Sequence, residues 1–438
     1  MEVSVKNFGT ISSATVNIGG LTVITGENDT GKSTIGKILF SIVKAVARYE
    51  EDLEEEKEDR FTEEAQNLYY ELRRQVNFAE HAEIRDLFHP RKFYNQMKID
   101  QSKAYEERID ELARLGAESD IHEHSLNFFV RSLNRIVEIM NEPDDAPSVM
   151  DRAVRKSFFS EFKDEIISRG ANSSRAASIS VTDGASNLID ITWEKEGVHK
   201  LSYVDDLGYS DATYVDSPAI IQFHQIAMMA KTLFEKDSSR LTVPLHIKDL
   251  ANKLSDSKFG ISGIKEMLPE SDGMPNISSQ VDRLLGGVLS YDDDRSDFLL
   301  ERNGYTISSS NIASGIKALG ILDMLVRGGN VTKNTLLVLD EPEVNLHPKW
   351  QVDYCEIVCS LVQAGVDIII TTHSPYIVEA LKYFSEKSSI AHRFYLAQKV
   401  ADCESIFSDI TKDISVAIDT LAAPLIRLNN DTLEDFLG

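Results

Sequence analysis

Residues 21–34, LTVITGENDTGKST, constrain this chain more than any other stretch: an apolar run leads through a loop, with a glycine at each end, into a helix-forming segment. The loop fits the pattern G-x-x-x-x-G-K-[ST], whose glycines let backbone N–H groups turn inward around phosphate oxygens. The following helix directs the positive end of its dipole at the same anion. An ordinary turn before a helix also contains Asn, Asp and Thr, but the order strand, loop, helix is the one that phosphate binding requires. The stretch therefore predicts a nucleoside triphosphate site.

Two side chains of this loop have distinct expected roles. Lys32 reaches the β- and γ-phosphates as a compact cation, and Ser33 gives its hydroxyl to Mg²⁺. ATP and Mg²⁺ are thus the expected ligands. The expected nucleotide-binding residues of the loop are Gly26, Glu27, Asn28, Asp29, Thr30, Gly31, Lys32, Ser33 and Thr34.

Composition indicates a globular and acidic protein. The 438 residues suffice for one large core or two, and 42% hydrophobic with 27% charged residues is not a disordered composition. The formal net charge is -25 and the pI is near 4.8. Such a field repels DNA at range, so any DNA or RNA contact needs a local basic patch or a partner protein. Bulk electrostatics therefore excludes a general nucleic-acid binder.

No segment predicts secretion or a membrane span. The first twenty residues lack a basic region with a long apolar run behind it, and no apolar stretch approaches the roughly 20 residues that cross a bilayer. Cys355 and Cys359 lie at helical spacing and are expected in the core; with Cys403 they make neither a C-x-x-C pair nor a disulfide framework. We expect a cytoplasmic protein without membrane contact.

The first 171 residues change character twice. Residues 2–25 read as a small β-meander that leads to the phosphate loop, and a helix is expected over residues 33–49. Residues 50–66, EEDLEEEKEDRFTEEAQ, are intensely acidic, and the sequence stays helix-forming to about residue 170. The acidic run is interpreted as a solvated helix face, with a docking site for a basic partner as the alternative. We expect several helices in a lobe inserted into a nucleotide-binding core.

Strand patterns return in the second half. Residues 172–206 alternate with turn-forming DGAS and EG, which predicts antiparallel strands. Asn303 and Gly304, between two alternating runs, predict a hairpin. The expected domains are residues 1–45 and 172–438, which form the two parts of the core, and the helical lobe of residues 46–171.

Two apolar strands of the second half end in residues suited to phosphate chemistry. Residues 335–339 run into Asp340 and Glu341, and VDIIITTHS ends in His373, with a helix expected between them over about 351–364. Buried parallel strands present functional residues at their carboxyl ends, beside the phosphate loop. Asp340 is expected to hold Mg²⁺ or its water, Glu341 to orient and deprotonate the attacking water, and His373 to sense the γ-phosphate.

Taken together, GENDTGKST, ASGIK, LLVLDEPEVNLHP and IIITTHSP resemble the ABC-type ATPases of the RecF, Rad50, SMC and OLD class. The resemblance covers about residues 1–45 and 205–400. It is strongest to OLD-like ATPases that accompany phage-defence effectors, such as those of the PARIS, Septu and retron systems. It implies an α/β fold: a P-loop NTPase with an ABC-type head, composed of a mixed β-sheet core and an antiparallel β subdomain, and an inserted helical lobe.

The resemblance also implies a composite ATP site. Ser314, Gly315 and Lys317 match the signature segment, which caps the γ-phosphate bound by a second protomer, so ATP is expected to join a head-to-head homodimer or higher oligomer. Asn345 and His347 match the D-loop, where protomers meet. Lys317 stands where many transporters have glutamine. The Q-loop glutamine is not obvious, and Gln222 and Gln225 are its two candidates.

Two biological roles remain open at this point. OLD nucleases carry a TOPRIM nuclease after the switch histidine, and residues 374–438 hold no acidic cluster of the kind that two-metal chemistry needs. We therefore expect a slow ATPase that regulates a separately encoded nuclease or toxin in anti-phage defence. The alternative is a DNA repair or chromosome-maintenance ATPase that clamps DNA, which the net charge disfavours. A monomeric module that binds nucleotide without hydrolysing it is the alternative to the dimeric ATPase.

Overall fold

The computed structural model divides the chain into two compact units. One contains Met1–Ala47 and Met150–Gly438, and the other contains Arg48–Val149. The second boundary thus lies before residue 150, whereas the sequence analysis placed it after residue 171. The structure describes residues 1–79, 81–118, 123–142, 146–163, 165–167, 176–194, 197–230, 243–256, 277–344 and 346–423.

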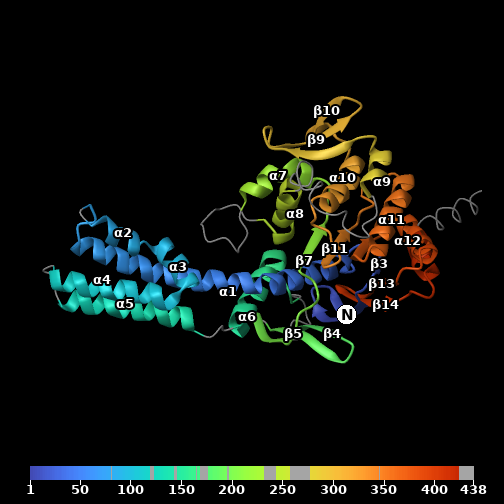
Figure 1. The fold of residues 1–438 in the computed structure, drawn as a ribbon. Helices are drawn as coiled ribbons and strands as arrows, with labels where there is room; N and C mark the ends of the chain where they lie inside the picture. The colour runs from blue at the N-terminus through green and yellow to red at the C-terminus, as the bar shows by residue number, and fades with distance from the viewer. Residues whose placement is uncertain are drawn as a thin grey trace, which may run out of the picture. The chain divides into compact units, whose positions relative to one another are not determined.

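The first unit is built on a mixed sheet of eleven strands among the described residues, with the order β6-β5-β4-β1-β2-β14-β13-β3-β12-β11-β7. Figure 1 labels several of these strands, among them β3, β11 and β7. Five neighbouring strands at one end of this order are parallel: β13, β3, β12, β11 and β7. Every residue of β3 is buried, as expected for a parallel strand covered on both faces. These five strands are β3 (Leu21–Gly26), β7 (Asp211–Val215), β11 (Thr335–Asp340), β12 (Asp367–Thr372) and β13 (His392–Ala401).

The other six strands form the antiparallel part of the sheet, except that β14 runs parallel to β2. The antiparallel strands expected over residues 172–206 are confirmed as β4, β5 and β6. The meander expected over residues 2–25 is wrong in part, because β14 and β13 lie between β2 and β3. The strands are β1 (Glu2–Phe8), β2 (Ile11–Asn17), β4 (Ala177–Asp183), β5 (Ser186–Glu194), β6 (Gly197–Tyr203) and β14 (Glu404–Asp409).

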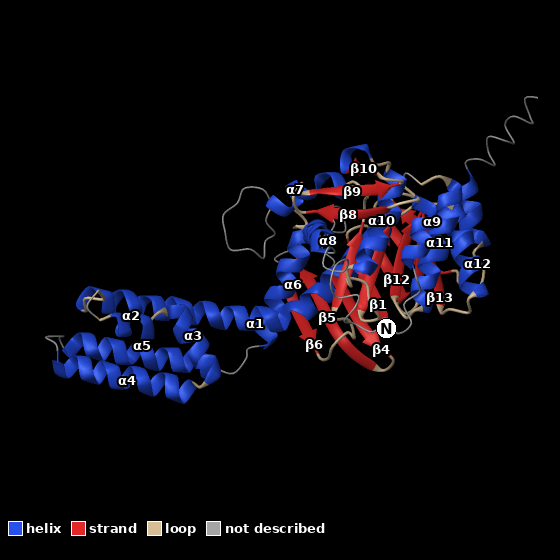
Figure 2. Ribbon diagram, turned by 45° about the horizontal axis from the view of Figure 1, so that its top comes forward, coloured by secondary structure: helices blue, strands red, loops and turns tan. Residues whose placement is uncertain are grey.

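A separate antiparallel sheet of three strands lies apart from the large one (Figure 2). Its order is β10-β9-β8, and the hairpin expected at Asn303 and Gly304 is confirmed. Both residues have positive φ, +48° and +79°, as a type I′ turn requires. The strands are β8 (Val288–Asp292), β9 (Asp297–Arg302) and β10 (Tyr305–Ser308), followed by a short 3₁₀ turn, Ser309–Asn311.

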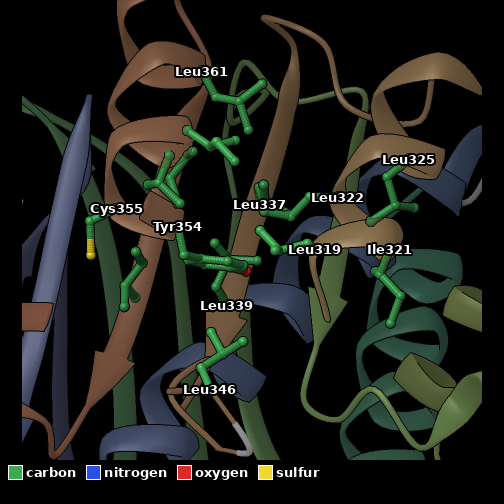
Figure 3. Packing of buried hydrophobic residues seen from close by; sticks show 14 of the residues in the cluster. Leu319, Ile321, Leu322, Leu325, Leu337, Leu339, Leu346, Tyr354, Cys355 and Leu361 are labelled. Atoms are coloured by element: carbon green, nitrogen blue, oxygen red, sulfur yellow. The ribbon is translucent and has the colours of Figure 1, made fainter. Parts of the chain in front are cut away.

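Helices complete the core of the first unit. Leu337 and Leu339 of β11 pack with Leu319 and Leu322 of α10 and with Tyr354 of α11 (Figure 3). Cys355 and Cys359 are buried on α11, so their expected core position is confirmed. The helices are α6 (Ala146–Phe162), α7 (Ile220–Met229), α8 (Leu245–Asp256), α9 (Ile277–Leu285), α10 (Ser314–Arg327), α11 (Pro348–Gln363) and α12 (Pro375–Lys387).

The helix after the phosphate loop is longer than expected. α1 (Lys32–Gln75) continues through the acidic run, where the sequence analysis ended the helix near residue 49. No glycine or proline stands between Gly36 and Pro90 to end it. Most acidic side chains of residues 50–66 are not described by the structure, so the interpretation of this run as a solvated helix face stays a prediction.

The second unit is helical and has its own core. Phe61, Phe93 and Phe129 are among its fully buried side chains. Arg108 is also buried there and donates to the carbonyl oxygens of Ala104 and Leu87; burial lowers its pKa to about 10. Besides the distal part of α1 the unit contains α2 (Ala82–Leu87), α3 (Pro90–Ile99), α4 (Gln101–Glu118) and α5 (Glu123–Asn141). In the part of the chain described, no helix is long and apolar enough to span a bilayer.

Candidate functional site

The five parallel strands end at the same edge of the large sheet. β12 lies between β3, which leads into the phosphate loop, and β11, which ends in Asp340. The register places Thr372 beside Thr25 and Thr371 beside Asp340. The motifs of both halves of the chain therefore meet at one edge, as expected for parallel strands.

The phosphate loop has backbone geometry that only glycine fits. Gly26 has φ +143°, and a Cβ there would lie 2.2 Å from the carbonyl oxygen of Ala397 on β13. Gly31 has φ +82°, and its Cβ would lie 2.6 Å from the Ile11 side chain. Both positions are therefore closed to other residues, by conformation and by space.

Neighbouring strands support the loop from outside. The Ser405 hydroxyl of β14 donates to the carbonyl oxygen of Thr30 at 2.8 Å, and the Thr30 hydroxyl donates to the carbonyl oxygen of Glu27 at 2.8 Å. Lys399 of β13 pairs with Asp29 at 3.2 Å, and both side chains are exposed. These contacts hold the loop in shape at the N-terminus of α1, where the helix dipole favours an anion.

Lys32 is the buried cation of the loop. Its ammonium donates to the carbonyl oxygen of Glu27 at 2.7 Å and lies 3.9 Å from Glu341 Oε1. Burial lowers the pKa of Lys32, although the carboxylates of Glu341 and Asp340 act against this change. A phosphate group could replace the contact with the Glu27 carbonyl oxygen and bring a negative charge closer to this cation than Glu341 does.

Ser33 and Asp340 lie in direct contact. The Ser33 hydroxyl donates to Asp340 Oδ1 at 2.8 Å, across 307 positions of sequence. Two further hydroxyls orient the carboxylate: Tyr214 donates to Oδ2 at 2.8 Å, and Thr371 donates to Oδ1. Burial and the charge of Asp340 raise the pKa of Tyr214 well above its ordinary value, so the phenol remains a neutral donor.

These oxygens fit a magnesium ion. Mg²⁺ is commonly bound by one or two protein oxygens together with substrate phosphates and waters. Ser33 and Asp340 supply a hydroxyl and a carboxylate beside the phosphate loop. Within the described ranges, no group of three or more His, Cys, Asp or Glu gathers as a metal site.

Glu341 occupies a strained position at the end of β11. Its φ is +46°, a left-handed conformation that costs a non-glycine residue on the order of 1 kcal/mol. Its N–H donates to the carbonyl oxygen of Thr371 at 3.0 Å, which holds this turn against β12. The side chain is 31% exposed and therefore accessible to water.

His373 lies between two carboxylates. Its Nδ1 is 3.6 Å from Glu341 Oε1 and 3.3 Å from Glu343 Oε1. The ring is 42% exposed, whereas Glu343 is 5% exposed. At this edge, Lys32 thus lies beside Glu341, Glu341 beside His373, and His373 beside Glu343.

The structure also describes the three predicted signature residues and His347, one of the two predicted D-loop residues. Ser314 is exposed at the start of α10, with Gly315 and Lys317 buried after it. Burial lowers the pKa of Lys317, and Asp297 acts against this change. His347 caps the N-terminus of α11 by accepting the Lys349 N–H at 3.3 Å. Asn345 lies outside the described residues.

Neither Q-loop candidate makes a hydrogen bond to the site residues that the structure describes. Gln222 and Gln225 are both exposed on α7, and Gln225 donates to the carbonyl oxygen of Ser296 at 2.7 Å. The residue that follows β7 beside Asp340 is Asp216, because Val215 pairs with Leu339.

Three residues of the site were missed by sequence reasoning: Tyr214, Thr371 and Glu343. Tyr214 stands in TYVD near the end of β7, and Thr371 stands in ITTHS near the end of β12. Glu343 stands in DEPE, three residues after Asp340. Hydroxyl and carboxyl groups so close to strand ends were the available signal.

Comparison with known proteins gives one family match. Residues 200–379 match the family described as "AAA domain, putative AbiEii toxin, Type IV TA system". This range includes Ser314, Asp340, Glu341 and His373, whereas the phosphate loop lies before it. No curated protein matches the chain.

Solved structures of SMC heads show a distant similarity. An SMC head bound to the C-winged-helix domain of ScpA shares 11% identity, with 95% of this chain and 98% of that chain covered and a TM-score of 0.42. The SMC head domain from Thermotoga maritima shares 11% identity over 93% and 97%, with a TM-score of 0.35. An SMC head with an extended coiled coil, bound to a ScpA domain derived from Pyrococcus furiosus, shares 10% over 95% and 97%, with a TM-score of 0.42. These values assign no function, so the ATPase similarity of the chain comes from the family match over residues 200–379.

Proposed function

We propose that this chain is an ABC-type ATPase that binds ATP with Mg²⁺ and hydrolyses it slowly to ADP and phosphate. The observation that carries the proposal is the meeting of Lys32 and Ser33 with Asp340, Glu341 and His373 at one sheet edge. The match of residues 200–379 to an AAA domain supports it.

Each residue has a role in this proposal. Lys32 binds the β- and γ-phosphates, and Ser33 with Asp340 holds Mg²⁺, which neutralises charge on the phosphate oxygens when bound. Glu341 accepts a proton from the water that attacks the γ-phosphorus, while the bond to the β–γ bridging oxygen breaks and ADP leaves. His373 donates a hydrogen bond to the γ-phosphate.

The proposed active unit is a head-to-head homodimer with two composite sites. Ser314 is exposed at the N-terminus of a helix, and its hydroxyl makes no hydrogen bond within the described part of its own chain. A helix N-terminus is an anion site, and here it would be completed by the phosphate that a second protomer brings.

Replacing Glu341 by Gln tests both proposals. The variant should bind ATP but hydrolyse it at least about 10²-fold more slowly, because the general base is lost while Ser33 and Asp340 remain. Sedimentation of this variant with and without ATP should show an ATP-dependent or constitutive dimer. Glu356→Gln, on the exposed face of α11, is the matched control. Wild-type turnover in the Glu341 variant contradicts its assignment, and a monomer under all conditions favours the nucleotide-binding module.

The proposed biological role is a regulator of a separately encoded nuclease or toxin in anti-phage defence. The toxin–antitoxin wording of the matched family supports it, and the net charge of -25 weighs against a DNA clamp. A tagged pull-down from the native host, beside a salt-titrated duplex-binding assay, separates the two roles. A stoichiometric partner whose toxicity depends on Lys32 is expected. Tight duplex binding with a steep salt dependence and no partner would establish the repair alternative.

A further inference from the structure

Glu343 is a buried carboxylate that the proposed hydrolysis does not use. It stands three residues after Asp340, and its side chain is 5% exposed. Its Oε1 accepts two hydrogen bonds from the end of β12, from the Thr372 hydroxyl at 2.7 Å and from the His373 N–H at 2.7 Å. Its Oε2 is buried without a hydrogen-bond partner among the described residues.

Burying a carboxylate is costly unless strong contacts compensate for the lost hydration. A neutral polar side chain of similar size could also accept the two hydrogen bonds from the end of β12, without the cost of burying a charge. Glu343 instead directs its one satisfied oxygen at the residue that the proposed function uses to contact the γ-phosphate. The contact joins the segment after β11 to the end of β12.

The imidazole of His373 lies near two carboxylates, and the nearer one is that of Glu343. Its Nδ1 lies 3.3 Å from Glu343 Oε1 and 3.6 Å from Glu341 Oε1. A proton shared with Glu341 would occupy the carboxylate that must accept a proton from water. A proton shared with Glu343 leaves Glu341 free, and no described residue contacts Nε2 of the exposed ring.

We propose that Glu343 is a positioning residue that holds the Nδ1–H of His373. It thereby keeps Glu341 unengaged as the general base. A ring that also carries a proton on Nε2 then donates that N–H to the γ-phosphate, because both ring nitrogens are donors in the doubly protonated imidazole. The inference rests on the proposed ATPase function, because it concerns the geometry of the same site. It adds a second carboxylate with a task different from that of Glu341.

The position of the ring proton is measurable without nucleotide. In full-length protein labelled with ¹⁵N-histidine, the His373 ring signals are identified by their loss in His373→Gln. The nucleotide-free wild type should carry the proton of the neutral ring on Nδ1. Glu343→Ala should remove this preference, whereas Glu341→Ala should leave it in place. An unchanged tautomer in Glu343→Ala, or an equal change in Glu341→Ala, overturns the proposal.

Kinetics give the second readout. Glu343→Ala should lower kcat by about 10²-fold, because a misplaced catalytic group costs about that much, while KM for ATP stays within about threefold. Glu343→Gln keeps the acceptor oxygen and should show an intermediate loss; it also carries the test if the alanine variant does not fold. Glu356→Ala is the surface control. A wild-type kcat in Glu343→Gln would sink the inference.

The two proposals fail in different ways. If the wild type does not hydrolyse ATP while His373 still carries its proton on Nδ1, the proposed function is wrong and the positioning contact stands. If the wild type hydrolyses ATP and both Glu343 variants do so at the same rate, the positioning role is wrong and the ATPase assignment stands.

Discussion

At the residue scale, the carboxylate of Asp340 depends on hydroxyl donors that lie outside the recognised motifs. Tyr214→Phe removes the 2.8 Å bond to Oδ2 and leaves that buried oxygen with one donor fewer. We expect the free energy of unfolding to fall by about 1–3 kcal/mol. The Mg²⁺ concentration for half-maximal ATPase activity should rise about tenfold, because the carboxylate is less well oriented.

Denaturant unfolding and a Mg²⁺ titration of ATP turnover measure these two effects. Tyr305→Phe is the control, since that ring is 74% exposed on the small sheet. A variant with wild-type stability and wild-type Mg²⁺ dependence would show that Tyr214 does not orient Asp340.

The same residues show what the sequence could predict about the site. Lys32, Ser33, Asp340 and His373 stand at fixed spacings from strand ends, so the chemistry identifies them without coordinates. Tyr214 and Thr371 act through cross-strand register, which no local pattern contains. Glu343 was within the quoted motif, but only its burial and its contacts with β12 distinguish it from a surface carboxylate.

At the element scale, a group of four charges, with both lysines buried and the two carboxylates partly buried, joins α1, β7 and α8. Lys44 lies 2.5 Å from Asp211 and 2.6 Å from Asp249, and Lys253 lies 2.6 Å and 2.9 Å from the same carboxylates. Burial acts to lower the pKa of both lysines, but the two carboxylates raise the pKa of Lys44 overall. With all four charges present, the group is neutral.

Asp249→Asn leaves two lysines facing one carboxylate and should lower the free energy of unfolding by about 3–5 kcal/mol, the cost of breaking a buried pair. Urea unfolding measures this effect. Glu386→Gln, which breaks the exposed pair with Lys382 on α12, should cost no more than about 0.5 kcal/mol. Equal effects of the two substitutions would show that the buried group does not stabilise the packing of these elements.

Element lengths and partners were predicted unequally well. The hairpin at Asn303 and Gly304 followed from turn chemistry alone. The position of β3 in the sheet could not be predicted in this way. Its apolar pattern is the same whether its neighbour is β2 or a strand about 370 residues away. The length of α1 was underestimated because several helices were expected where one helix continues from the phosphate loop through the acidic run.

At the scale of the whole molecule, the first unit contains a histidine whose charge links stability to pH. His246 of α8 is 3% exposed; its Nδ1 lies 2.6 Å from Glu161 Oε2, and its Nε2 lies 3.4 Å from Asp216 Oδ2. Burial alone would lower its pKa, but hydrogen bonds and charge from Asp216 and Glu161 outweigh burial and raise the pKa to about 9. The ring is therefore charged in the folded protein at neutral pH.

This raised pKa predicts a loss of stability in mildly alkaline solution. An unfolded histidine titrates near pH 6.5, so the stabilisation is complete below that pH and is lost as the pH rises through about 9. The interval between the pKa values of the unfolded and the folded protein corresponds to about 3 kcal/mol in the free energy of unfolding. The difference in free energy of unfolding between the wild type and His246→Asn should therefore be largest at pH 6 and should shrink by about that amount toward pH 9.5. Urea unfolding across this range measures it, and taking the difference cancels the contributions of other titrating groups. A difference that stays constant from pH 6 to pH 9.5 would show that His246 is not charged when buried between these carboxylates.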